Sequence, residues 1–115
     1  MRSKACGLAA LIVILSACAT PTEMRQTKPT LTLESTKLAK EVGVCIADQW
    51  DSDPSSVHSS KWRESKSGYT VSAYCEGMYP CMLADITSIP KGSRTVTYTR
   101  GIGSEVFMRA AMNCQ

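Results

Sequence analysis

This chain of 115 residues contains six cysteines, which could form disulfides, bind a metal or act as nucleophiles. Four lie in the C-terminal two thirds: Cys45, Cys75, Cys81 and Cys114. A zinc site usually draws on two close pairs of ligands, but Cys75 and Cys81 are separated by five residues and the single histidine, His58, stands alone. No Cys-x-x-Cys redox motif occurs. We therefore predict two disulfide bonds, no metal site and no cofactor.

The predicted connectivity follows from the elements that carry these cysteines. Cys45 belongs to the apolar stripe of one predicted helix and Cys114 to that of another, so packing both helices on one sheet face brings them together. Cys75 and Cys81 stand at the junction of two predicted strands, where the ends of a hairpin lie close enough for a bond. Four cysteines allow three connectivities, and the sequence alone leaves that choice open. We expect the pairs Cys45–Cys114 and Cys75–Cys81.

The other polar motifs lack the patterns that cation binding or catalysis requires. The acidic cluster at Asp51 begins like a calcium loop, but Ser56 stands where that loop needs glycine. His58 has serine neighbours, yet no G-x-S-x-G elbow is present. For Glu76 and Asp85, salt bridging or solvation is commoner than paired-carboxylate catalysis. We expect no enzymatic activity, no catalytic residue and no small-molecule substrate.

Two segments have the apolar spacing of amphipathic helices. In residues 34–50 the stripe contains Leu38, Val42, Cys45, Ile46 and Gln49, and Ser35 or Thr36 is placed to cap the N-terminus. Gly43 costs helix stability and marks close packing. The second helix ends the chain after an N-cap at Ser104, and its stripe contains Val106, Phe107, Ala110, Ala111 and Cys114.

Strands are predicted between the two helices. Residues 69–76 alternate, with Tyr69, Val71, Ala73 and Cys75 on one face. A hairpin is predicted over 82–100, with its turn at 90–93, and residues 57–62 are the candidate for a fourth strand. The prediction is a small two-layer α+β domain with three or four antiparallel strands, braced by disulfides, and both helices on one sheet face.

Aromatic residues near the Cys75–Cys81 loop are the candidate contacts for a partner. Tyr74 lies on the strand face opposite the buried one, and Met78 and Tyr79 lie in the loop. If Tyr74 and Tyr79 are exposed, they form an aromatic patch of the kind that is enriched at protein interfaces. The alternative is partial burial under the helices or under the N-terminal segment.

The first seventeen residues have the composition of an export signal. A positive end with Arg2 and Lys4 precedes the apolar run 8–15, which is too short for a membrane-spanning helix. Leu15-Ser16-Ala17-Cys18 then resembles the lipobox of bacterial lipoprotein precursors, and all four positions match. We therefore expect residues 1–17 to be a signal peptide.

The resemblance to lipoprotein precursors implies that Cys18 becomes the first residue of the mature chain and carries acyl groups such as palmitate. Ala19, where retention at the inner membrane needs aspartate, implies the periplasmic face of the outer membrane. The oxidising periplasm in turn favours disulfides. Several acyl chains hold a protein far more firmly than one.

A tether and a domain are predicted after the lipid site. Residues 18–33 are expected to be the lipidated N-terminus and a flexible tether, because they are rich in threonine, contain Pro21 and Pro29 and lack an apolar period. Residues 34–115 are the expected compact domain. About 80 residues form only a small core, so disulfides contribute much of its stability.

Charge and composition narrow the expected partners. The formal charge is +3, and it falls to +1 when Arg2 and Lys4 are removed with the signal peptide. A nearly neutral domain with scattered basic residues is a poor match to nucleic acid. We expect an envelope lipoprotein that is held at the membrane by lipid and binds another envelope protein as an accessory subunit. The alternative is an inhibitor or exclusion factor that blocks a periplasmic hydrolase or an incoming phage.

Overall fold

The computed structural model describes residues 21–52, 60–76, 79–100 and 105–115. The predicted signal peptide, Cys18, His58, Met78 and Ser104 lie outside these residues, as do the side chains of Cys75 and Tyr79. The described residues form an α+β fold with the elements α2 (Pro21–Met24), β1 (Leu31–Ser35), α3 (Ala39–Ser52), β2 (Ser60–Glu64), β3 (Gly68–Glu76), β4 (Tyr79–Ile89), β5 (Gly92–Thr99) and α4 (Glu105–Asn113).

The strands form one antiparallel sheet in the order β1-β5-β4-β3-β2. Strands β2 to β5 follow one another as a meander, and β1 pairs with β5 at the far edge. The β4–β5 hairpin turns just before Gly92, which has a φ of 147°. A Cβ at Gly92 would meet the carbonyl oxygen of Ser35, so glycine is required there by both conformation and space.

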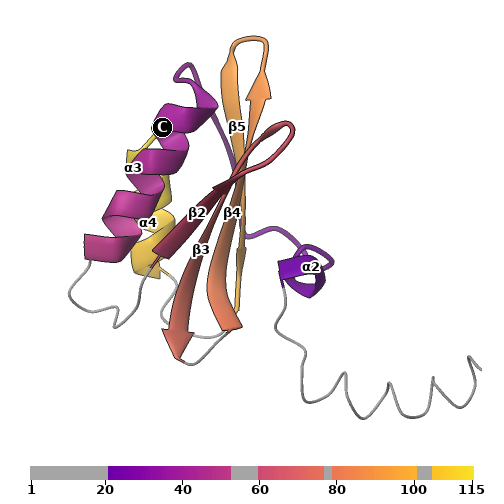
Figure 1. Ribbon diagram of the computed structural model, residues 1–115, viewed down its shortest axis with the longest axis vertical. Helices are drawn as coiled ribbons and strands as arrows, with labels where there is room; N and C mark the ends of the chain where they lie inside the picture. The colour runs from indigo at the N-terminus through magenta and orange to yellow at the C-terminus, as the bar shows by residue number, and fades with distance from the viewer. Residues whose placement is uncertain (1–20, 53–59, 77–78, 101–104) are drawn as a thin grey trace, which may run out of the picture.

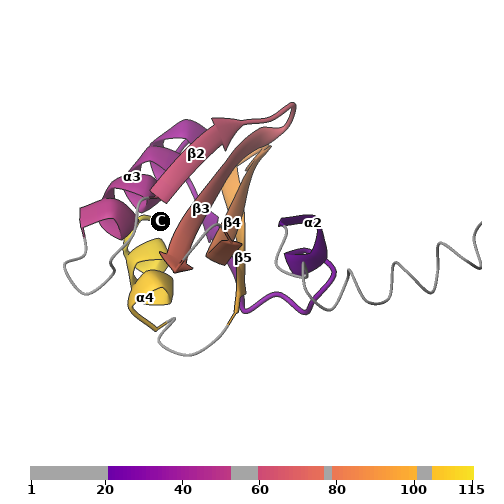
Figure 2. The ribbon, with the colours of Figure 1, turned by 60° about the horizontal axis from the view of Figure 1, so that its bottom comes forward.

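Helices α3 and α4 cover one face of this sheet, as Figures 1 and 2 show, and this confirms the predicted two-layer arrangement. We call this the helix face. The core between the layers is built from alternate strand residues and the inner sides of the helices. Its most deeply buried members are Val42, Ile46, Trp50, Val71, Ala73, Met82, Ala84, Ile86, Ala111 and Cys114.

Two cross-links hold the helices together. The indole Nε1 of Trp50 donates a hydrogen bond of 3.0 Å to the carbonyl oxygen of Phe107, and the two rings meet edge to face with centroids 5.6 Å apart. The predicted disulfide between Cys45 and Cys114 is present, with Cα atoms 5.7 Å apart. The Cys45–Cys114 prediction is therefore confirmed.

The N-terminus of α3 differs from the prediction. The helix begins at Ala39 rather than at residue 34, and Leu38 is 66% exposed instead of lying on the apolar stripe. The carboxylate of Glu41 accepts a hydrogen bond of 3.1 Å from the backbone N–H of Leu38, as in one half of a capping box. At the other end Gln49 is exposed and Trp50 takes the buried position.

The predicted flexible tether differs from the structure over residues 21–33. Residues 31–33 belong to β1, where Leu31 and Leu33 pair with Thr97 and Thr95 of β5. Residues 21–24 form α2, and Met24 is only 4% exposed. The segment can be ordered in spite of its composition because the sheet supplies its hydrogen bonds and a surface on which to pack. The folded domain therefore begins at least 13 residues before the predicted boundary at 34.

The other strands follow the prediction closely. Strand β3 confirms the predicted strand at 69–76, and β4 with β5 confirms the hairpin at 82–100. The candidate strand at 57–62 corresponds to β2, shifted to Ser60–Glu64. The described sheet has five strands rather than three or four, because β1, most of which lies in the predicted tether, pairs with the edge of β5.

Candidate functional site

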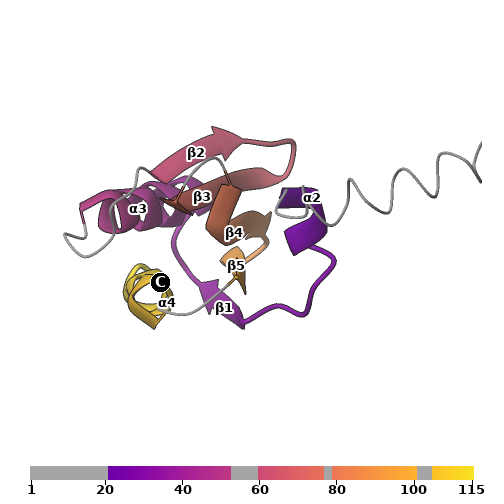
Figure 3. The same cartoon turned by 90° about the horizontal axis from the view of Figure 1, so that it is seen from below.

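Helix α2 lies against the sheet face that α3 and α4 leave open, as Figure 3 shows from below. We call this the open face. Its strand residues alternate with those of the core, and among them Leu83 is fully buried. Met24 is the buried residue of α2 itself. Neither residue belongs to the main core, and the burial of Met24 shows that α2 packs against the open face.

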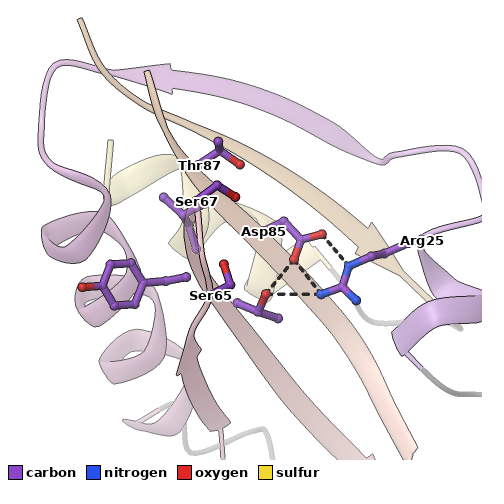
Figure 4. Close-up of a pocket in the computed structure, with 8 residues that line it drawn as sticks. Arg25, Ser65, Ser67, Asp85 and Thr87 are labelled. Atoms are coloured by element: carbon purple, nitrogen blue, oxygen red, sulfur yellow. Dashed lines mark hydrogen bonds and ion pairs between the residues drawn. The ribbon is translucent and has the colours of Figure 1, made fainter. Parts of the chain in front are cut away.

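The residue after α2, Arg25, makes the main polar contact of the open face (Figure 4). Its Nε lies 2.7 Å from Oδ2 of Asp85, and its Nη2 lies 2.8 Å from Oδ1 of the same carboxylate. Nη2 also donates to the hydroxyl of Thr70 at 3.2 Å, and that hydroxyl donates to Oδ1 of Asp85 at 2.8 Å. The expected salt bridging of Asp85 is confirmed, with a partner 60 residues away in sequence.

The hydrogen bond to Asp85 raises the pKa of Arg25 above its ordinary value, and this outweighs the lowering by partial burial. A raised pKa of a basic group means that its stabilising charge is lost only when the pH rises through that pKa. Because arginine is protonated throughout the physiological range even without this shift, Arg25 is charged at every physiological pH. The guanidinium group of Arg25 is therefore a permanent cation on the open face.

Two hollows share Arg25, Ser65 and Thr70 as part of their walls. The first has a volume of about 380 Å³ and extends to Asp85 and Thr87. Figure 4 shows Arg25 reaching Asp85 from the side of α2, whereas Ser65, Ser67 and Thr87 stand on the other side of the carboxylate. The lining of this hollow is mainly polar.

The second hollow has a volume of about 410 Å³ and extends to Pro21, Arg63, Ser72 and Tyr74. We call it the α2 groove. Register explains why these residues meet: Arg63 of β2 pairs with Thr70 of β3, and the alternation of β3 then places positions 72 and 74 on the same face. Helix α2 supplies the remaining wall.

The predicted contact residue Tyr74 lines the α2 groove and is half-buried. This agrees with the alternative of partial burial under the N-terminal segment. Met78 and the side chain of Tyr79 lie outside the described residues, so the aromatic patch stays a prediction.

The second predicted disulfide is described on one side only. Cys81 is disulfide-bonded, whereas the side chain of its predicted partner, Cys75, lies outside the described part of the chain. The register places residue 75 between the pairs Tyr74–Pro80 and Glu76–Tyr79, so the two cysteine positions lie on neighbouring strands. The pairing Cys75–Cys81 stays a prediction.

The described part of the chain contains neither a cluster of metal ligands nor a membrane-spanning helix. Among the described residues, no three side chains of histidine, cysteine, aspartate or glutamate gather as metal ligands. None of the described helices is both long and apolar enough to cross a membrane. Glu76 and Asp85 pair with Tyr79 and Thr70, respectively, and the six-residue offset along β3 separates these positions by about 20 Å.

Only some residues of the α2 groove could be predicted from the sequence. Alternation assigned Thr70, Ser72 and Tyr74 to the face away from the core, and the structure agrees. Arg25 was missed because it lay in the predicted tether, and Arg63 was missed because the predicted strand ended at residue 62, one residue before it. The alternation Leu31-Thr32-Leu33-Glu34 was the local signal that the N-terminal segment joins the sheet.

Comparison of this chain with protein-family models, with curated proteins and with solved structures finds no match.

Proposed function

We propose that this chain is an envelope lipoprotein, anchored through lipid on Cys18 at the periplasmic face of the outer membrane, whose disulfide-linked domain binds another envelope protein. The anchor rests on the lipobox sequence. The binding role is supported chiefly by the open face, where one short helix covers only part of a sheet whose other face is fully used by α3 and α4. A partly uncovered polar surface with a half-buried tyrosine suits recognition.

Two measurements test the two parts of this proposal. Intact mass of the envelope-purified protein should show removal of residues 1–17 and acyl groups on the new N-terminus, and Cys18→Ala should abolish both. An unacylated mature chain would contradict the anchor.

For the binding role, the acylated protein is cross-linked in its own envelope and its partners are identified by mass. Arg63→Asp, on the open face, should lose a partner that Arg109→Asp, on the exposed side of α4, retains.

A second candidate, an inhibitor or exclusion factor, is supported by the end of the β3–β4 hairpin. Among the described residues, β2 pairs with β3 no further than Ala73, and the last bond from the β5 side joins the N–H of Arg100 to the carbonyl of Cys81. Between these points Tyr74 pairs with Pro80, and Glu76 pairs with Tyr79. The end of a β-hairpin suits insertion into the site of a hydrolase or the surface of a phage.

The two candidates differ in which surface they require. Neither Met78 nor Tyr79 is among the described residues that line the α2 groove, so Met78→Ala and Tyr79→Ala should impair an inhibitor and spare a partner that binds the open face. The readouts are cell-wall hydrolase activity in envelope extracts and phage plating efficiency, with and without the protein. Equal values for cells with and without the protein would count against the inhibitory role.

A further inference from the structure

The α2 groove contains more hydrogen-bond donors than the protein itself uses. The bonds of Arg25 to Asp85 and Thr70 involve Nε and Nη2, and its Nη1 has no partner among the described residues. Arg63 is exposed and forms no ion pair within the same part of the chain. The hydroxyl group of Ser72 likewise makes no side-chain hydrogen bond there.

The α2 groove also has a net positive charge, which, like its unused donors, favours an anion. Arg25 is neutralised by Asp85, whereas no described carboxylate forms an ion pair with Arg63, so the residues that line the groove carry a net charge of about +1. Arginine presents a planar set of donors that suits an anion with several oxygens. A carboxylate offers only two oxygens, whereas a phosphate group offers enough acceptors for two guanidinium groups and a hydroxyl.

From these observations we infer that the α2 groove binds a phosphate group, held between Arg63, Nη1 of Arg25 and the hydroxyl of Ser72. Pro21 forms part of the wall, and it lies only three residues after Cys18. Three residues span at most about 10 Å. A lipid on Cys18 therefore keeps the groove at the membrane surface, where phospholipid headgroups are the nearest phosphates. The headgroup as source rests on the proposed function, whereas the phosphate chemistry does not.

Protection of Arg63 from phenylglyoxal tests this inference on the full chain. The acylated protein is held in neutral alkyl-maltoside micelles, and the modification of each arginine is followed by peptide mass at constant ionic strength. Adding phosphatidylglycerol to the micelles should slow the modification of Arg63 at least fivefold. Arg109 is exposed on α4 and should react at an unchanged rate, which makes it the internal control. Ser72→Ala should reduce the protection of Arg63 several-fold.

Further arms identify the source and the class of the anion. If inorganic phosphate protects Arg63 and phosphatidylglycerol does not, the groove binds phosphate but the phospholipid headgroup is not its ligand. If acetate protects Arg63 as well as phosphate does, the groove is not specific for phosphate and the inference is overturned. Equal protection of Arg109, or no protection by any probe, would overturn the site itself. Intact mass of the same sample reports acylation of Cys18 separately, so failure of the proposed anchor is distinguishable from failure of the groove.

Discussion

At the scale of single residues, the contact between Arg25 and Asp85 is the clearest candidate for an ion pair that affects stability. Its side chains are 38% and 25% exposed, whereas those of Arg94 and Glu34, the other described ion pair, are 47% and 57% exposed. Exposed pairs contribute little because water screens them and the long side chains lose entropy. The Arg25 pair is bidentate and better shielded, so its coupling energy should be larger.

We predict a coupling energy of about 1 kcal/mol for Arg25 and Asp85, measured by a double-mutant cycle with Arg25→Ala and Asp85→Ala in urea unfolding. The matched cycle with Arg94→Ala and Glu34→Ala should give less than about 0.5 kcal/mol. Equal coupling in the two cycles would show that burial of the Arg25 pair adds nothing.

Gly43 provides a second test at this scale. A Cβ at this position would lie 3.3 Å from Cβ of Tyr69 and 3.9 Å from Cδ1 of Ile86, which confirms the predicted close packing. The larger side chain of Gly43→Val must displace these neighbours, so we expect a loss of about 1–2 kcal/mol in the free energy of unfolding. Gln49→Val, at an exposed site of the same helix, should cost about 0.5 kcal/mol or less. A stabilised Gly43→Val protein would contradict the tight contact.

At the scale of elements, the sequence was most informative where a segment is amphipathic by itself. Of the stripe predicted for α4, Phe107, Ala111 and Cys114 are buried, although Val106 is exposed. In β5 the buried residues are Ser93, Thr95 and Thr97, so the turn at 90–93 rather than an apolar period indicated the β4–β5 hairpin. Strand β1 was missed because a five-residue edge strand gains its order from pairing with β5, whose paired residues lie 58 to 66 positions further along the chain. The contact between Arg25 and Asp85 has the same cause, since no local pattern reports a partner 60 residues distant.

The packing of α2 makes a prediction that separates it from a tether. Met24 is buried, so Met24→Ala should lower the free energy of unfolding by about 2 kcal/mol through lost apolar contacts. Thr22→Ala, on the exposed side of the same helix, should change it by less than about 0.5 kcal/mol. If both variants unfold like the unmodified protein, residues 21–24 contribute no packing energy and the tether is the better description.

At the scale of the whole molecule, the layers are held by links between distant parts of the chain. The N-terminal segment packs on part of the open face, and the disulfide joins α3 to the residue after α4 on the helix face. The C-terminal residue Gln115 adds hydrogen bonds to this arrangement, because its backbone carbonyl accepts from the hydroxyl of Ser35 at 2.9 Å and its amide donates to the carbonyl of Ala111 at 2.8 Å. Both ends of the described chain are thus tied to the sheet or its helices.

The disulfide between Cys45 and Cys114 should contribute more to global stability than any side-chain contact in the domain. It spans 69 residues, and closing a loop of that length removes about 4 kcal/mol of unfolded-state entropy in the chain-entropy model. A domain of this size has a net stability of only several kcal/mol. The double variant Cys45→Ala/Cys114→Ala should therefore be largely unfolded at 37 °C by circular dichroism. Cys75→Ala/Cys81→Ala removes the predicted Cys75–Cys81 bond, which would close a loop of only a few residues; we expect a cost of about 2 kcal/mol and a protein that remains folded. The opposite order of stability would mean that the short link, rather than the one between the helices, controls folding.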